Sequence, residues 1–380
     1  MTDAERLQDL RKQLDELDGL KDGHHQRIVR ILEENRERFG YDSRDRLKLA
    51  FYDARSYDTE AFEKANRERF DIHFFPNSLT PDSAEATRGF RAACIFVNDQ
   101  CDATVIERLA AYGVEIIALR CAGFNHVDLD ACEAHGIDVV RVPAYSPHAV
   151  AEHAIALILT LNRKLHEAYQ RNRRGDFVLD GLVGFDLIGK TVGVVGTGQI
   201  GRCMAEILLA FGCRVLAFDL HPDPALAERE GVDYVPLDEL FRESDIISLH
   251  VPLFPQTHHL LNREAFRAMK DGVMIINTSR GALVDTKALI GALKVGKVSA
   301  AGLDVYEEEA GIFFQDHSQR VLKDDVLARL LTFNNVLITS HQAFLTHEAL
   351  GSIAETTLAN LEEYVQGKRG EKLTHRVVKQ

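Results

Sequence analysis

Three side chains of the kinds that bind anions and move protons stand just after apolar stretches of the chain. Arg280 follows one such stretch, Glu309 closes an acidic run after a second, and His341 follows a third. A guanidinium binds a carboxylate through paired hydrogen bonds, and a histidine beside a carboxylate is a common acid and base. Taken singly, each residue also has a structural interpretation: a surface ion pair, a solvated acidic face and an ordinary half-buried histidine, respectively.

A glycine-rich turn indicates a second kind of chemistry, the binding of phosphate. It follows the apolar run 191–195, precedes a helical pattern, and reads Gly196-Thr197-Gly198-Gln199-Ile200-Gly201. The three glycines permit a tight turn, a close approach of the backbone to a pyrophosphate, and close packing of helix on strand. The helix N-terminus adds free N–H groups and a partial positive charge. The order of strand, turn and helix predicts a dinucleotide site, and a glycine turn without a ligand is the alternative.

An acid after the next apolar run selects among dinucleotides. Asp219 follows the run 215–218 and lies 18 residues beyond Gly201. A carboxylate there accepts hydrogen bonds from ribose hydroxyls and repels the 2′-phosphate of NADP, and neither Leu220 nor His221 supplies an arginine for that phosphate. The pattern therefore predicts NAD as the cofactor.

These groups must be positioned by a scaffold, and the chain has two series of alternating strand and helix patterns. Such alternation predicts parallel sheets with covered faces, and ligands bind at the carboxyl ends of their strands. In the second series we expect strands at 191–195, 214–218, 246–249, 273–277, 300–303 and 336–339. In the first series we expect strands at 47–52, 72–75, 93–97, 114–119 and 137–142, and helices at 59–70 and 103–112. A single long helix is expected at 149–172 and a last helix at 348–366.

The composition fits a two-domain protein that does not bind polyanions. A chain of 380 residues is too long to fold around one ordinary hydrophobic core. Its content of 46% hydrophobic and 27% charged residues is usual for globular proteins. The net charge of −13 disfavours nucleic acid as a partner. We expect a cytoplasmic location, because no apolar run is long enough to span a membrane and the first residues lack the apolar core of a signal peptide. The six cysteines form no CxxC pair and no cluster has zinc spacing, so we expect reduced structural thiols and no metal.

Residues 1–46 differ in texture from the remainder. Leucines recur every three to four residues between Leu7 and Leu17, and a second amphipathic pattern runs from Ile28 to Phe39. These patterns predict a helical extension that packs on its own subunit or pairs with another chain. The pair His24-His25 within it is interpreted as solvated rather than metal-binding.

Several stretches of the chain resemble the D-isomer-specific 2-hydroxyacid dehydrogenase family, and within it the fermentative D-lactate dehydrogenases. The resemblance covers about Leu47 to the C-terminus. The segment 311–316, and Ala310 where the wider family has proline, resemble the lactate branch. The stretches that carry the family resemblance are LRCAGFN (119–125), VPAYSP (142–147), the glycine turn, NTSRGAL (277–283), DVY (304–306) and HQAF (341–344).

The resemblance implies a catalytic role for each of the three polar residues. Arg280 would bind the substrate carboxylate and polarise the carbonyl, and His341 would be the general acid in ketone reduction. Glu309 would hold the imidazole and favour its protonated form. Backbone amides of Ala122 and Gly123 would also bind the carboxylate.

Further positions are implied to line the substrate and cofactor sites. Tyr145 would line the substrate site. Phe96 and Phe344 are aromatic and would restrict the pocket to a methyl side chain, unless both belong to the core. The cofactor pocket would be lined by Val251, Pro252, Thr278 and, near the nicotinamide, Asp304.

The resemblance implies a fold of two Rossmann-like or flavodoxin-like parallel-sheet domains. A substrate domain of 47–145 and 345–380 would be interrupted by an NAD-binding domain of 146–344, and closure about hinges near Tyr145 and Phe344 would exclude water from the cleft. The implied reaction is hydride transfer from NADH to pyruvate, giving D-lactate, with other small 2-keto acids as alternatives. The apolar helix at 149–172 fits a homodimer or homotetramer.

Two rival functions share parts of this pattern. A formate dehydrogenase-like enzyme has the glycine turn and the arginine, but its histidine pairs with a glutamine, which Glu309 argues against. A non-catalytic NAD-sensing corepressor keeps the catalytic set but carries a tryptophan in the substrate pocket, and this chain has no tryptophan. Only fold-level analogy supports the corepressor interpretation.

Overall fold

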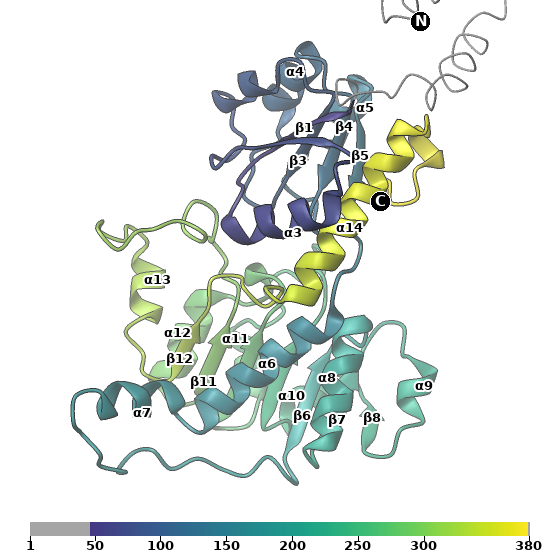
Figure 1. Cartoon of the computed structure of the whole chain (residues 1–380). Helices are drawn as coiled ribbons and strands as arrows, with labels where there is room; N and C mark the ends of the chain where they lie inside the picture. The colour runs from purple at the N-terminus through teal and green to yellow at the C-terminus, as the bar shows by residue number, and fades with distance from the viewer. Residues whose placement is uncertain (1–45, 379–380) are drawn as a thin grey trace, which may run out of the picture.

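Two parallel sheets organise residues 46–378, which are the residues that the computed structural model describes (Figure 1). The helical extension predicted at the N-terminus lies outside the described residues. The first sheet, in the order β2-β1-β3-β4-β5, contains β1 (Lys48–Phe51), β2 (Asp71–Phe74), β3 (Ala92–Ile95), β4 (Ile116–Leu119) and β5 (Asp138–Arg141). The second, in the order β12-β11-β10-β9-β6-β7-β8, contains β6 (Thr191–Val195), β7 (Arg214–Phe218), β8 (Val232–Tyr234), β9 (Ile246–Leu249), β10 (Val273–Asn277), β11 (Val298–Leu303) and β12 (Val336–Ile338).

The strand order predicts one ligand position in each sheet from topology alone. All pairs of neighbouring strands in both sheets are parallel. The order reverses between β1 and β3 in the first sheet and between β6 and β9 in the second. Ligands of open α/β sheets bind outside the carboxyl ends of the strands at such a reversal. The predicted fold class of two parallel-sheet α/β domains is therefore confirmed.

Helices cover both faces of the second sheet. On one face, α6 and α8 pack with the sheet around a core that includes Ile158 and Met204, and on the other, α10, α11 and α12 enclose a core that includes Phe266 and Leu289. The helices that follow α5 in the chain and precede the C-terminal one are α6 (Pro147–Asn162), α7 (Leu165–Asn172), α8 (Gln199–Ala210), α9 (Pro224–Ala227), α10 (Leu237–Glu243), α11 (Arg263–Ala268), α12 (Thr286–Lys294) and α13 (Asp325–Leu330).

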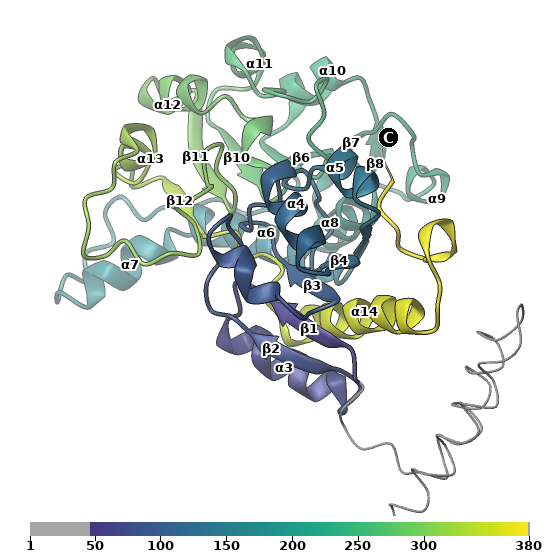
Figure 2. The ribbon, with the colours of Figure 1, turned by 90° about the horizontal axis from the view of Figure 1, so that it is seen from above.

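The C-terminal helix returns to the first sheet. Helix α14 (His347–Val365) packs against α3 (Ser56–Asn66), and its Leu358 and Leu361 are fully buried in the core of the first sheet (Figure 2). Helices α4 (Ala103–Ala111) and α5 (Leu129–Ala134) also cover this sheet. The chain therefore leaves the first sheet before α6, builds the second sheet, and comes back.

The prediction of one long helix at 149–172 is wrong, because the helix is broken. Ser146 caps α6 by accepting a hydrogen bond from the N–H of Ala149. Lys164 then takes the left-handed conformation, with φ of 49°, and α7 starts anew in a different direction (Figure 1). A left-handed residue ends the regular pattern of helical hydrogen bonds. The edge strand β8 was also not predicted, since only the first of its three residues is buried and it leaves no continuous apolar run.

Two further sequence features have structural counterparts. None of the helices in residues 46–378 combines the length and the apolar character that crossing a membrane requires. All six cysteines are free, and burial raises the pKa values of Cys94 and Cys121 to about 12, which keeps these thiols protonated. The free, protonated thiols of Cys94 and Cys121 agree with cysteines that pack in the core.

Candidate active site

The predicted acid–base pair is in direct contact. The Nδ1 atom of His341 lies 2.8 Å from Oε1 of Glu309, and the second carboxylate oxygen accepts the N–H of Tyr306 at 3.1 Å. With the carboxylate ionised, Nδ1 must carry the proton that it donates, so Nε2 is the nitrogen left for a substrate. The arrangement thus fixes both the ring and its tautomer.

A buried aspartate builds the turn that carries His341. The carboxylate of Asp304 has no solvent exposure, and it accepts hydrogen bonds from the backbone N–H of Gln342 at 2.8 Å and of Ala343 at 2.9 Å. The hydroxyl of Thr339 donates to it at 2.6 Å, and Nε2 of His153 lies 3.5 Å away. Burial raises the pKa of Asp304, but these hydrogen bonds outweigh it and hold the pKa below its usual value.

His341 itself has an unusual backbone conformation. Its φ is 54°, in the left-handed region that residues other than glycine rarely adopt. Its N–H donates to the backbone carbonyl of Asp304 at 2.7 Å, which helps to hold the conformation. Strained residues of this kind concentrate at functional sites, where the surrounding structure imposes the geometry.

Arg280 lies against the loop that is predicted to bind a carboxylate. A Cβ atom placed on Gly123 would come within 2.8 Å of Nη2 of Arg280, so the guanidinium faces the backbone of that loop. Nη1 donates to the carbonyl of Ser279 at 2.7 Å, and Asn277 donates to the carbonyl of Arg280 at 2.8 Å. Ala122 and Gly123 are both only partly buried beside this guanidinium.

An aromatic group joins the two halves of the site. The ring of Phe344 lies 5.7 Å from that of Phe96 and 6.3 Å from that of Tyr145, centroid to centroid. Burial raises the pKa of Tyr145 to about 12 against an opposing effect of Arg280, so its hydroxyl stays neutral. Phe96 and Phe344 are also members of the first core, so the packing role and the pocket role coincide in the same residues.

Phe314 is a residue of this group that sequence reasoning missed. Its ring lies 5.7 Å from that of Phe96 and 6.1 Å from the imidazole of His341. It packs against the core of the first sheet and also against the core of the second. Phe314 has a left-handed φ of 62°. The only sequence signal for a role of Phe314 in the site was the phenylalanine pair at 313–314, in the segment that resembles the lactate branch.

The glycine turn has the geometry of a phosphate cradle. Gly196 has φ of 94°, which a side chain would strain, and a Cβ on Gly201 would lie 1.8 Å from the carbonyl oxygen of Gly196. Gly198, in contrast, faces open space, so its backbone is accessible to a ligand. Gln199 and Ile200 open α8, whose first N–H groups point toward that space. The residues present therefore fit a dinucleotide.

Asp219 is held at the end of β7 beside this turn. One carboxylate oxygen accepts the N–H of Thr197 at 2.7 Å, and the other accepts the N–H of His221 at 2.9 Å. Burial raises the pKa of Asp219, but the hydrogen bonds prevail and keep it below its usual value. The carboxylate is thus ionised and keeps lone pairs free for ribose hydroxyls.

The other predicted cofactor residues lie near the turn or at neighbouring strand ends. Val251 borders Gly196, whose added Cβ would lie 2.8 Å from its Cγ1. Exposed Pro252 follows it and accepts the hydroxyl of Thr257 at 2.8 Å. The hydroxyl oxygen of Thr278 is buried without a hydrogen-bond partner in the protein, which is what a site for a polar ligand group would leave.

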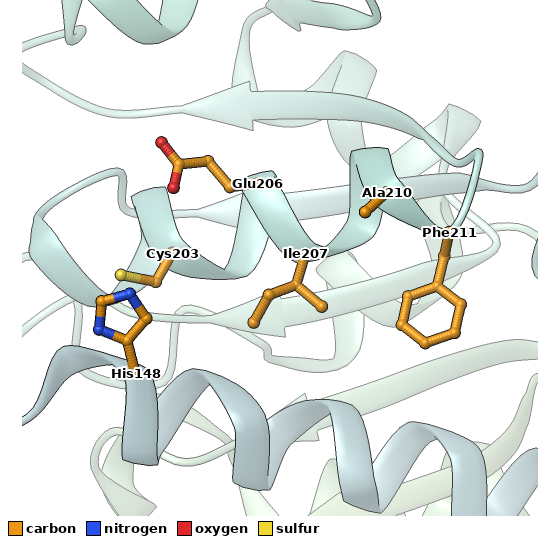
Figure 3. Close-up of a pocket in the computed structure, with 6 residues that line it drawn as sticks. All are labelled: His148, Cys203, Glu206, Ile207, Ala210 and Phe211. Carbon is orange, nitrogen blue, oxygen red and sulfur yellow. The ribbon is translucent and has the colours of Figure 1, made fainter.

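A separate pocket lies away from these residues, between α6 and α8. Figure 3 shows its lining, in which Ile207, Ala210 and Phe211 form an apolar floor beside His148, Cys203 and Glu206. None of the predicted catalytic or cofactor residues lines it. The predicted site residues therefore lie at the strand ends described above, and not in this pocket.

Comparisons with known proteins show which family the chain is similar to. The family profile described as "D-isomer specific 2-hydroxyacid dehydrogenase, NAD binding domain" matches residues 155–343. The chain is similar to the D-lactate dehydrogenase of Escherichia coli (strain K12), with 54% identity over 323 residues that cover 85% of this chain and 98% of that relative.

Solved structures agree in fold as well as in sequence. The apo-structure of D-lactate dehydrogenase from Escherichia coli has a TM-score of 0.80 and 52% identity, and the match covers 87% of this chain and 100% of that one. The structure titled for the pyruvate reductase of Chlamydomonas reinhardtii has a TM-score of 0.82 and 48% identity, over 86% of this chain and 98% of that one. These values make common descent of the whole described fold plain.

Proposed function

The chain belongs to the D-isomer specific 2-hydroxyacid dehydrogenase family, and we propose that it reduces pyruvate to D-lactate with NADH. It is an NAD-dependent dehydrogenase of small 2-hydroxy and 2-keto acids. The observation that carries the proposal is the pair of His341 and Glu309 at 2.8 Å, on a turn that the carboxylate of Asp304 holds. The similarity to D-lactate dehydrogenases of known structure supports the choice of substrate.

Arg280 and the loop of Ala122 and Gly123 would bind the carboxylate of the keto acid. The guanidinium lies against Gly123, so one anion between them receives charge from the side chain and hydrogen bonds from backbone N–H groups. This would fix the substrate at one end and leave its carbonyl free to turn toward His341. The neutral Tyr145 would close the same side.

His341 would donate a proton from Nε2 to the carbonyl oxygen, and in the reverse direction accept it. Glu309 would stabilise the imidazolium and hold the ring in place. Arg280 would in addition polarise the carbonyl, because positive charge near the oxygen stabilises the negative charge that develops there.

NAD supplies the hydride chemistry when it is bound. The glycine turn, Asp219 and the unpartnered hydroxyl of Thr278 would hold it with the nicotinamide at the strand ends. The protein's own contribution is to orient the two reactants and to exclude water. Phe96, Phe314 and Phe344 would exclude water from around His341 and leave space for a methyl group.

Three further features belong to the proposal. The substrate domain would comprise 47–145 and 345–380 and the NAD-binding domain 146–344, with hinges near Tyr145 and Phe344. The protein would act in the cytoplasm. It would be a homodimer or homotetramer, supported by exposed apolar side chains between α7 and β6, where Leu179 is 78% and Val183 83% exposed.

One assay tests the proposal directly. The purified protein is given NADH and a panel of 2-keto acids of increasing side-chain length, and the product is analysed on a chiral column. We expect the highest kcat/KM with pyruvate and D-lactate as the product. An L-product, or absence of turnover across the panel while NADH still binds, would contradict it, and the second outcome would favour a sensor.

A further inference from the structure

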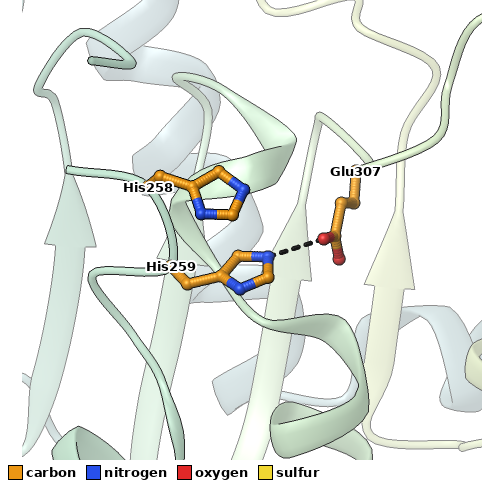
Figure 4. A group of neighbouring side chains, drawn as sticks. All are labelled: His258, His259 and Glu307. Carbon is orange, nitrogen blue, oxygen red and sulfur yellow. Dashed lines mark hydrogen bonds and ion pairs between the residues drawn. The ribbon is translucent and has the colours of Figure 1, made fainter. Parts of the chain in front are cut away.

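Two consecutive histidines and a glutamate form a cluster beside the second sheet that the proposed reaction does not use. His258, His259 and Glu307 each bring one ligand atom to within 4.8 Å of the others (Figure 4). The histidines precede α11, and the glutamate follows β11 (Val298–Leu303), so distant parts of the chain meet here. Imidazole nitrogens and carboxylate oxygens are the ligands that Zn²⁺ prefers, together with thiolates.

The backbone places both imidazoles on the same side of the chain. His259 has φ of 50°, in the left-handed region, and its N–H donates to the carbonyl of Ala282 at 2.8 Å. As a result the two rings stack, with centroids 3.9 Å apart and planes inclined by 26°. In an extended chain, neighbouring side chains would point in opposite directions. This turn therefore holds two nitrogen ligands side by side.

The carboxylate of Glu307 is held in place by other groups. Its Oε2 accepts the hydroxyl of Thr286 at 2.8 Å and the N–H of the same residue at 3.3 Å, while Oε1 lies 2.6 Å from Nε2 of His259. Burial raises the pKa of Glu307, but these hydrogen bonds outweigh it and hold the pKa below its usual value. One oxygen of the ionised carboxylate is thus oriented by Thr286, and the other is turned toward the imidazole, as in the surroundings of bound metals.

We propose that His258, His259 and Glu307 bind a single transition-metal ion of the Zn²⁺ class. Zn²⁺ sites with three protein ligands complete their coordination with water, so this ligand number fits an exchangeable ion better than a permanent structural one. The ion would take the position of the proton between His259 and Glu307, and that proton would pass to solvent. The contact of 2.6 Å between His259 and Glu307 would lengthen as the ion enters between them, and exposed His258 would turn its ring toward the ion.

The proposed metal site is also linked through backbone packing to Arg280, the residue proposed to bind the substrate carboxylate. Gly281, which follows Arg280, packs against the backbone of the segment after β11. A Cβ on Gly281 would lie 2.4 Å from the backbone nitrogen of Glu307. The backbone of one proposed ligand, Glu307, therefore packs directly against the residue that follows Arg280. The binding itself does not depend on which keto acid the enzyme reduces.

Calorimetric titration of the untagged, full-length protein with ZnCl₂ tests the proposal, and Co²⁺ absorption reports the coordination. We expect one ion per chain in the unmodified protein. His258→Phe keeps an aromatic ring for stacking but removes a ligand, and should weaken the binding of Zn²⁺ at least tenfold. Glu307→Gln should weaken it by a similar factor and remove the Co²⁺ bands of a tetrahedral site. Unchanged thermal melting and NADH binding in His258→Phe would show that the fold persists.

Two control variants separate this site from others in the chain. His24→Ala/His25→Ala removes the other pair of adjacent histidines, and Cys203→Ser removes the sulfur that lies near His148 in Figure 3. Both controls should bind Zn²⁺ as tightly as the unmodified protein. Undiminished binding in His258→Phe, or loss of binding in either control instead, would overturn the proposal.

Discussion

The hydrogen bond between His341 and Glu309 determines which nitrogen of the imidazole serves the substrate. Because the carboxylate engages Nδ1, the proton for the carbonyl oxygen must come from Nε2. The residue types and their positions after apolar runs made the two residues candidates, and the resemblance to the family predicted that they pair. The role of Phe314 was not predictable in the same way, because it depends on a left-handed backbone that no local pattern of residue types indicates.

Replacement of Glu309 by glutamine should slow the reduction. We expect kcat to fall at least roughly tenfold and the fast range of the pH profile to move to lower pH, because a neutral amide no longer stabilises the imidazolium. Steady-state rates between pH 5 and 9 measure this. Glu308→Gln, in the exposed neighbour, is the control and should leave the profile unchanged. A pH profile of Glu309→Gln that coincides with the original would refute the pairing's catalytic role.

Replacement of Asp219 by alanine should reduce the preference for NADH over NADPH. Loss of the carboxylate removes both the hydrogen bonds to the ribose and the repulsion of the 2′-phosphate, and we expect the ratio of kcat/KM values to fall about tenfold, which corresponds to about 1.4 kcal/mol. Asp233→Ala, an exposed acid on β8, is the matched control. An unaltered ratio in Asp219→Ala would show that selectivity lies elsewhere.

Turns and helix ends position these residues, and here the sequence predicted less. The strands were expected within a few residues of their observed bounds, since buried parallel strands leave continuous apolar runs. The break between α6 and α7 was missed because the residues around Lys164 suit a helix, and nothing in their types indicates that Lys164 adopts the left-handed conformation. The turn at 340–343 likewise depends on one buried carboxylate from another strand.

Asp304 should therefore support both stability and rate. Asp304→Asn keeps the shape but loses charged hydrogen bonds, and we expect it to lower the free energy of unfolding by about 2 kcal/mol and to reduce kcat. Since the folded pKa of Asp304 is depressed, its contribution is present above about pH 4 and is lost as the pH falls through the folded value. Melting temperatures from pH 3 to 8 measure this, with Asp271→Asn, 91% exposed, as the control. Equal losses at pH 8 and pH 3 would contradict the linkage.

The loop at 310–316 should influence the choice of substrate through Phe314. Phe314→Ala would open space beside Phe96 and His341, so we expect kcat/KM to fall for pyruvate and to fall less, or rise, for 2-ketobutyrate and phenylpyruvate. The ratio of these constants is the measurement. Phe333→Ala, a half-buried ring on the second core only, is the control for general loss of packing. An equal decrease for all three acids would argue against a role in selectivity.

The molecule as a whole has a chain that crosses between its two sheets and a long exposed segment between α7 and β6. The resemblance of the sequence to a family, and not its periodicity, predicted the return of the last helix to the first sheet. Helix α14 has the same amphipathic pattern as the helices of the second sheet, so nothing local says which sheet it joins. Its place follows from the pairing with α3 in the folded chain.

The exposed segment should hold subunits together. A charge at Leu179 or Val183 would be buried without a partner at an interface, so we expect Leu179→Asp/Val183→Asp to reduce the mass of the assembly in solution to that of a smaller species. Light scattering after size-exclusion chromatography measures the mass. Val321→Asp, at a site 87% exposed outside this segment, is the control. If both variants keep the original mass, the segment is not an interface.

The left-handed backbone conformation of His341 creates a conflict between catalytic activity and thermal stability. A residue with a side chain costs about 1–2 kcal/mol in that conformation, whereas glycine adopts it without this cost. A variant library ranked by heat resistance alone would therefore enrich His341→Gly, which could no longer protonate a substrate. Selection for thermal stability and selection for catalytic rate therefore favour different residues at this position. A screen for a more stable enzyme must measure both properties.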